Sequence, residues 1–231
     1  MGSNPRPVTF AVEDDQPISA LLQTPPESRA CYVMAHGAGA GMAHPFMASF
    51  ANHLAEHGVA TFRYQFPYME RGSKRPDPPK VAQATVRAAV AATSRLVPGL
   101  ALFAGGKSFG GRMTSQAQAA APLPGVLGLV FVGFPLHPAG KPSDERAAHL
   151  SKVHIPMLFL QGTRDELASL ELLHPVVARL GRRATLHLMD DADHAFHVPA
   201  RTRRTDAQVR LEMAAAAAEW IAMTIAGTPG A

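Results

Sequence analysis

GKSFG, at residues 106–110, has the pattern G-x-S-x-G. An apolar run precedes it at residues 100–104, and a helical stretch of small residues follows at 111–121. This order of strand, sharp turn and helix is the context in which the pattern forms a nucleophile elbow, which lifts a serine hydroxyl off the edge of a sheet. Both glycines are needed, because side chains there would collide with each other or with the strand. We therefore predict that Ser108 is a nucleophile.

A serine nucleophile needs an adjacent base, and the base needs an orienting acid. On such an elbow the acid and then the base follow the serine along the chain. The apolar run at 157–160 predicts a buried strand that leads to Asp165, just past the strand's carboxyl end. The next predicted strand, 184–189, leads into the loop that carries His194. The order predicts Asp165 as the acid and His194 as the base.

Neighbouring side chains offer alternatives to both predictions. His197 competes with His194 as the base, although the D-H-x-F context favours His194. A carboxylate at a strand end reaches the outer nitrogen of the base better than one beside the base in sequence, which disfavours Asp190, Asp191 and Asp193. His187, His194 and His197 match no standard zinc spacing, and His187 lies in a predicted strand. We expect no metal and no cofactor.

An oxyanion hole is predicted from the strand at residues 31–35, which leads into HGAGAG at 36–41. Glycines allow backbone N–H groups to approach a ligand closely. One donor is the N–H of the residue after the nucleophile, here Phe109, and the other comes from this early loop. The second donor is therefore Ala38 or Gly39. Further side chains predicted to contact substrate are His44, Tyr68, Arg71 and His137.

Seven short motifs spread over nearly the whole chain carry a family resemblance: HGAG at 36–39, MAHP at 42–45, FPYM at 66–69, GGKSFGGR at 105–112, FPLHP at 134–138, GTRD at 162–165 and DHAF at 193–196. With them the chain resembles the α/β-hydrolase superfamily. It is similar to a dienelactone-hydrolase-like branch that includes testis-expressed protein 30 and a hydrolase-like subunit of the nonspecific-lethal complex. The resemblance implies a serine hydrolase carrying Ser108, Asp165 and His194, and names no substrate.

The fold class expected is α/β: an α/β-hydrolase fold with a mostly parallel central sheet flanked by helices. Apolar alternation at 8–12 and 18–22 predicts a leading hairpin, and later strands alternate with helices. We expect Asp77 to cap a helix that begins at Pro78, and Thr205 with Gln208 to form a capping box. The strand at 128–134 and the strand at 157 are separated by little more than one short helix. No lid domain is therefore expected.

The composition of the chain limits its expected domain number, location and partners. The chain has 231 residues, 47% hydrophobic and 17% charged, which suits one globular domain, placed at 6–227. No apolar run approaches the ~20 residues that cross a bilayer, and residues 1–6 lack a signal-peptide pattern. The single cysteine, Cys31, fits a reducing cytoplasm. The net charge of +4 comes with no interleaved aromatics, so we expect neither nucleic-acid nor membrane binding.

A small soluble ester is the predicted substrate, hydrolysed by a Ser-His-Asp triad. The sequence leaves open a thioester or amide hydrolase with the same machinery, and a non-catalytic interaction module that retains the fold. The basic loop after the strand at 59–62 carries Arg63, Arg71, Lys74 and Arg75. If it forms one wall of the pocket, esters bearing a carboxylate are preferred. Lys107 is expected to pair with a nearby carboxylate.

Overall fold

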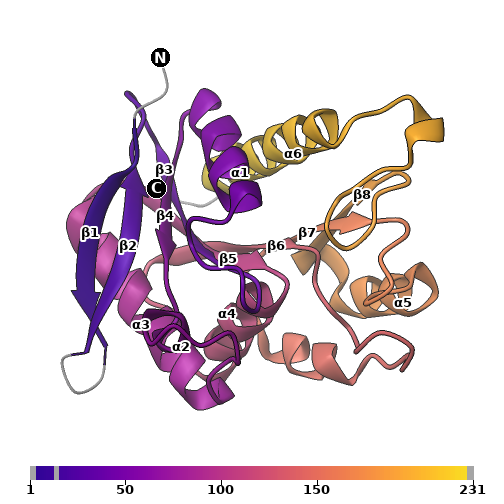
Figure 1. The fold of residues 1–231 in the computed structure, drawn as a ribbon, viewed down its shortest axis with the longest axis horizontal. Coiled ribbons are helices and arrows are strands. Elements are labelled where there is room, and N and C mark those ends of the chain that lie inside the picture. Colours follow the sequence, from indigo (N-terminus) through magenta and orange to yellow (C-terminus); the bar gives the residue numbers. More distant parts are fainter. Residues whose placement is uncertain (1–3, 13–15, 228–231) are drawn as a thin grey trace.

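Across the residues that the structure describes, 4–12 and 16–227 of a computed structural model, eight strands form one central sheet (Figure 1). They are β1 Arg6–Ala11, β2 Pro17–Gln23, β3 Ala30–Ala35, β4 Val59–Tyr64, β5 Ala101–Lys107, β6 Val126–Val132, β7 Met157–Gly162 and β8 Ala184–Met189. Their order is β1-β2-β4-β3-β5-β6-β7-β8. β1 and β2 form an antiparallel hairpin, β2 pairs antiparallel with β4, and the other neighbours are parallel. The predicted hairpin and mostly parallel sheet are confirmed.

The central strands are buried on both faces. Every residue of β3, β4 and β7 is buried. Parallel strands covered on both sides have nearly continuous apolar sequences rather than alternating ones, as in MLFLQG of β7. Burial of this sheet therefore creates two apolar cores, one on each face.

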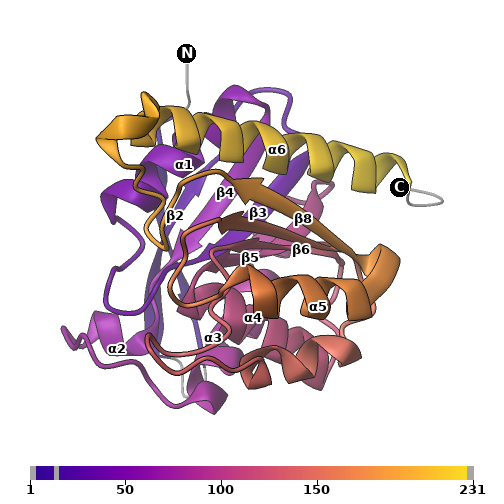
Figure 2. The same ribbon diagram turned by 90° about the vertical axis from the view of Figure 1, so that its right-hand side faces the viewer.

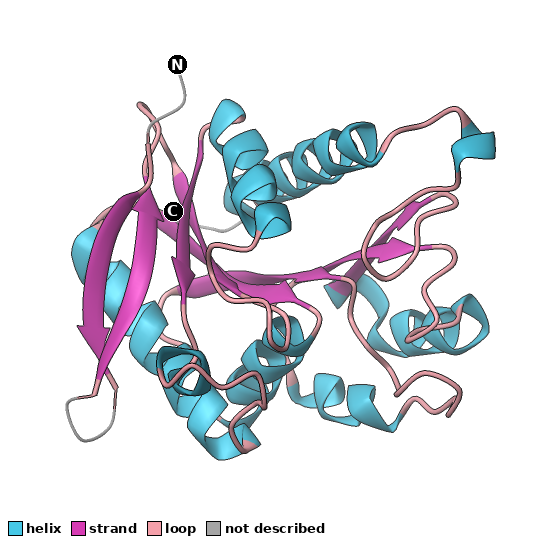
Figure 3. Cartoon of the chain, in the orientation of Figure 1, coloured by secondary structure: helices cyan, strands magenta, loops and turns pink. Residues whose placement is uncertain are grey.

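Helices form a layer on each face of the sheet (Figure 2). α1 Pro45–Glu56 and α6 Asp206–Ala226 pack on one face, where Phe50 and Trp220 are buried. α3 Pro79–Leu96, α4 Phe109–Ala120 and α5 Leu170–Leu180 cover the other face (Figure 3). Short helices lie in the connections: α2 Pro67–Glu70, η2 Glu145–Lys152, η3 Gly181–Arg183 and η4 Ala200–Thr202. The described helices include none long and apolar enough to cross a bilayer.

Two helix starts test the predicted caps. The Thr205 side chain accepts from the Gln208 N–H and the Gln208 side chain reaches back, so the capping box of α6 is confirmed. The predicted cap of α3 is wrong, since α3 begins at Pro79 and its N-cap is Pro78, with ψ 149°. A residue before proline is disfavoured in the helical region, which moves the start one position on. Asp77 instead accepts a hydrogen bond from the Tyr68 N–H.

The connection between β6 and β7 confirms the predicted absence of a lid domain. Every residue of 133–156 is described, and the only helix among them is η2. η2 packs against α4 beneath the sheet, away from the carboxyl ends of the strands. The nucleophile elbow is therefore not covered by an inserted domain.

Candidate active site

The turn between β5 and α4 has the strained geometry expected of a nucleophile elbow. Ser108 has φ 49° and ψ −112°, a conformation that non-glycine residues rarely adopt. A Cβ added to Gly106 would lie 2.1 Å from the Ala35 carbonyl oxygen, and one on Gly110 would lie 2.5 Å from the same atom. Both glycines are needed because the elbow presses against the end of β3, the neighbouring strand.

Three predicted residues from three different loops form one hydrogen-bonded chain. The Ser108 Oγ lies 2.9 Å from the His194 Nε2, and the His194 Nδ1 lies 2.7 Å from the Asp165 Oδ2. With Nδ1–H donating to the carboxylate, Nε2 is free to accept the serine proton. Asp165 is buried, and also accepts from the Gln161 side chain at 2.5 Å and the Leu167 N–H at 2.8 Å. These donors hold the carboxylate in the orientation that the histidine requires.

The alternative bases and acids have other partners. The His197 Nδ1 lies 2.5 Å from Asp206, and Asp193 accepts from the N–H groups of Ala195 and His197. Asp191 lies 3.8 Å from the Arg201 guanidinium. The structure thus brings His194 and Asp165 to Ser108, whereas the side chains of His197, Asp191 and Asp193 have other partners.

The early glycine loop presents one of the two predicted amide donors. The Gly39 N–H donates to the Tyr68 hydroxyl at 3.0 Å, so it does not point toward Ser108 as an oxyanion donor. The Ala38 N–H has no acceptor among the described residues, and Ala38 lines the cavity beside Ser108. Phe109 opens α4, where the first amides lack helical partners. The geometry favours Phe109 and Ala38.

Buried side chains fix this loop. The His36 Nδ1–H donates to the Gly37 carbonyl at 2.7 Å, while Nε2 accepts from the Phe66 N–H at 3.2 Å. Burial lowers the pKa of His36 to about 4, which keeps the ring neutral and suited to both bonds. Arg63 was expected in an exposed basic loop, but it lies in β4, is buried, and donates to the Met42 carbonyl at 3.2 Å. Its guanidinium therefore contacts the backbone just after the glycine loop.

A cavity of about 640 Å³ opens beside Ser108. His194, Ala38 and His44 line it, and His44 is one of the predicted substrate contacts. Its other walls come mainly from α1 and from residues near His194.

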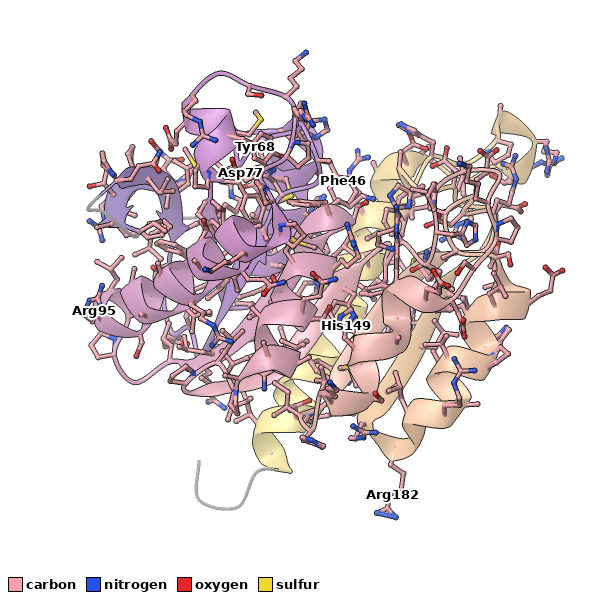
Figure 4. The ribbon with its side chains drawn as sticks, turned by 90° about the horizontal axis from the view of Figure 1, so that it is seen from below. Phe46, Tyr68, Asp77, Arg95, His149 and Arg182 are labelled. Carbon is pink, nitrogen blue, oxygen red and sulfur yellow. The ribbon has the colours of Figure 1, made fainter. Side chains whose placement is uncertain are left out.

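Three predicted substrate contacts lie elsewhere. Tyr68 is fully buried and holds Gly39, while Arg71 forms an ion pair with Asp77 at 2.5 Å. His137 is buried, and its Nδ1–H donates to the Pro138 carbonyl at 2.9 Å. None of these three side chains lines the cavity. Figure 4 shows Tyr68 and Asp77 side by side near one end of the molecule.

Lys107 has a role that the sequence did not indicate. Instead of pairing with a carboxylate, its Nζ donates to the His194 carbonyl at 2.6 Å, and it lies 5.2 Å from the centre of the Phe196 ring. Burial lowers the pKa of Lys107 to about 8, and the carboxylates of Asp165 and Asp193 oppose that shift. Lys107, which directly precedes Ser108, is therefore tied to the loop that carries His194.

A family model described as an alpha/beta hydrolase domain matches residues 28–222. The chain belongs to the α/β-hydrolase family. The order of Ser108, Asp165 and His194 along the chain is the order that this fold uses. The elbow, the glycine loop and the hydrogen-bonded chain of this α/β hydrolase lie at the positions where the fold carries its chemistry.

Solved structures similar to this α/β hydrolase span it almost completely. A dienelactone hydrolase from Anabaena variabilis has a TM-score of 0.76 at 20% identity, covering 95% of this chain and 98% of its own. XC6422 from Xanthomonas campestris, described as a serine hydrolase without a lid, has a TM-score of 0.72 at 21% identity, covering 94% and 95%. Est1E from Butyrivibrio proteoclasticus, bound to ferulic acid, has a TM-score of 0.75 at 16% identity, covering 95% and 99%. At these identities the likeness shows the shared fold.

Proposed function

We propose that this α/β hydrolase is a serine hydrolase that cleaves small carboxylic esters. The observation that carries the proposal is the unbroken chain of hydrogen bonds from Ser108 through His194 to Asp165. A hydroxyl becomes nucleophilic when a base takes its proton, and a carboxylate behind the base stabilises the imidazolium that forms. The strained backbone at Ser108 presents the hydroxyl to the cavity rather than to the core.

The proposed reaction uses this geometry. The Ser108 Oγ attacks the ester carbonyl carbon while His194 takes the hydroxyl proton, and the N–H groups of Phe109 and Ala38 stabilise the oxyanion. His194 then returns the proton to the leaving alkoxide as the carbon–oxygen bond of the ester breaks. In the second half, water attacks the acyl-enzyme with His194 again as base, releasing the acid and restoring Ser108. The serine and histidine supply every proton transfer, so the proposed mechanism requires no metal and no cofactor.

The cavity and the connection between β6 and β7 support small esters as the substrate class. A volume of about 640 Å³ suits a small organic molecule, and no lid domain separates Ser108 from solvent. The names of two similar structures, a dienelactone hydrolase and an esterase domain from a Rhodothermus marinus protein, agree with ester chemistry. We further propose that residues 6–227 form one catalytic domain that works in the cytoplasm, and that the narrower branch resemblance reflects common ancestry.

A fluorophosphonate probe tests the proposed nucleophile. We expect the wild type to be labelled at Ser108, and Ser108→Ala to lose the label and about 10⁴-fold or more of aryl-ester turnover while its melting temperature is kept. A panel of matched esters, thioesters and amides then identifies the favoured acyl group. A folded wild type without labelling or turnover would refute the proposal and favour an interaction module.

A further inference from the structure

The lining of the cavity beside Ser108 includes a polar pair that the proposed chemistry does not use. Ser49 of α1 and Arg210 of α6 both line the cavity, and the Arg210 Nε donates to the Ser49 hydroxyl at 3.1 Å. Ser49 follows Pro45, the first residue of α1, by four positions, which is ~6 Å along a helix axis. Since Pro45 also lines the cavity, the wall follows about one turn of α1 and includes Arg210 beside Ser49.

The Arg210 guanidinium keeps unused hydrogen-bonding capacity. Asp206 lies one helical turn earlier, and against the desolvation that burial imposes, hydrogen bonds from His197 and Val198 and the charges of His197 and Arg210 lower the pKa of its carboxyl. Its hydrogen bonds go elsewhere, since its Oδ2 contacts the His197 Nδ1 at 2.5 Å and its Oδ1 accepts from the Val198 N–H at 3.0 Å. Within the described part of the chain, no carboxylate forms an ion pair with Arg210, and its two terminal nitrogens have no protein acceptor. A guanidinium carries five N–H donors, of which Ser49 uses one.

Much of the remaining wall is apolar, and His44, Lys107 and His197 also line the cavity. Pro45, Phe46 and Met47 supply one side from the first turn of α1, and Leu167 and Ala195 supply another. Aspartate and glutamate are absent from the described residues that line the cavity. A ligand that fits has a reactive ester at Ser108, an apolar spacer, and an anion at its far end.

We propose that this hydrolase selects esters whose apolar chain ends in a carboxylate, and that Arg210 binds that carboxylate. The inference rests on the proposed function and names its substrate class. It assigns the preference for anionic esters to Arg210 of α6 and not to the loop that carries Arg71. The Arg71 guanidinium is already paired with Asp77. The carboxylate lies on the acyl side or on the alcohol side of the ester, and matched ligands distinguish the two.

Binding is measured by calorimetry on Ser108→Ala protein, so that no ligand is hydrolysed. Monomethyl adipate is compared with dimethyl adipate for an acyl-side carboxylate, and ω-acetoxyvalerate with its methyl ester for an alcohol-side carboxylate. We expect one of the two anionic ligands to bind about tenfold more tightly than its neutral partner at low salt, because a charge-assisted hydrogen bond to a guanidinium forms. Added salt weakens the preference.

Substitutions assign the preference to its residue. In the Ser108→Ala background, Arg210→Gln should abolish the preference and Arg210→Lys should restore part of it, with melting temperatures reporting folding. Arg182→Gln makes the same change in net charge, and Figure 4 shows Arg182 at the bottom edge of the molecule, well away from Phe46. Arg182→Gln should leave the preference intact.

Two outcomes overturn the inference. One is equal affinity for both members of each ligand pair, and the other is a preference that Arg210→Gln leaves unchanged. Hydrolysis of a neutral aryl ester by the wild type reports the proposed function separately. A protein that hydrolyses this ester without preferring anions refutes the substrate class alone, whereas loss of labelling and hydrolysis refutes the esterase proposal.

Discussion

The nucleophile elbow at residues 106–110 and the part of the cavity wall formed by Ser49 and Arg210 border the same cavity but are held in different ways. The elbow is fixed by backbone contacts, because a Cβ at either glycine would meet the Ala35 carbonyl within 2.5 Å. The wall is fixed by a side-chain hydrogen bond between residues 161 positions apart. Changes in the elbow and its partners should alter the reaction, whereas changes in the wall should alter which ester binds.

The two regions should also differ in which kinetic constant a substitution changes. Contacts made equally to substrate and transition state change KM without changing kcat, and we expect this of the wall. Groups that act only as charge develops change kcat, and we expect this of the residues joined to Ser108. Measuring both constants for each variant therefore sharpens the comparison.

The largest expected effect is at the base. His194→Ala should lower kcat by about 10⁴-fold or more, as Ser108→Ala does, because the two residues act as one unit. His197→Ala is the matched control, since His197 contacts Asp206 and not Ser108. Steady-state assays with one aryl ester compare the two variants. If His197→Ala proves crippling and His194→Ala mild, the assigned base is wrong.

Replacing Asp165 should lower turnover less than replacing His194. Asp165→Asn keeps the shape of the side chain but replaces the acceptor of the His194 Nδ1–H by a neutral amide, which favours the wrong tautomer. We expect kcat to fall by about 10³-fold with KM little changed. Asp193→Asn, which alters a carboxylate that accepts only loop N–H groups, should retain most activity. Equal losses in the two variants would contradict the assignment of Asp165.

Much of this site could be predicted from the sequence because its parts are local. The elbow, the strand ends before Asp165 and His194, and the glycine loop each lie within a few residues of a recognisable pattern. The burial of Arg63 could not be predicted. Arg63 belongs to β4 because the pairing of β4 with β2 extends past it to Tyr64, and the sequence alone does not show where that pairing ends. Strand pairing of this kind is a tertiary property.

The choice between Ala38 and Gly39 as donor was equally hidden. Both belong to the same loop, and only the Tyr68 hydroxyl, 29 positions away, distinguishes them by accepting the Gly39 N–H. The Ser49–Arg210 contact also has no local signal, because α1 and α6 meet only when the sheet brings them to one face. Sequence patterns thus predicted the hydrogen-bonded chain of Ser108, His194 and Asp165 more fully than the contacts that surround it.

Removing the Tyr68 hydroxyl should have an intermediate effect. Tyr68→Phe leaves the Gly39 N–H without its acceptor and loosens the loop that carries the Ala38 N–H. We expect kcat to fall about tenfold with little change in KM, because the donor acts in the transition state. Tyr32→Phe is the control, since its buried hydroxyl donates to the Val130 carbonyl inside the sheet. Both variants should lose about 1 kcal/mol of stability, and a kcat loss shared by both would refute the role of Tyr68.

The smallest predicted effects concern the charge of Lys107, which joins the elbow to the base loop. Burial lowers its pKa from 10.5 to about 8, so between these values the unfolded chain holds a proton that the folded protein has lost. Stability rises with pH wherever the unfolded state binds more protons. The melting temperature of the wild type relative to Lys107→Met should therefore rise as pH increases from about 8 toward 10.5. Thermal melts across this range measure the difference.

The same ionisation should alter turnover. A charged Lys107 near His194 disfavours the imidazolium that forms during attack, and the neutral amine can still donate to the His194 carbonyl. We expect kcat of the wild type to rise about threefold through pH 8, with no such step in Lys107→Met. Lys107→Arg stays charged throughout and should also lack the step. A step of equal size in all three proteins would assign the ionisation to another group and leave Lys107 with the single task of anchoring the loop.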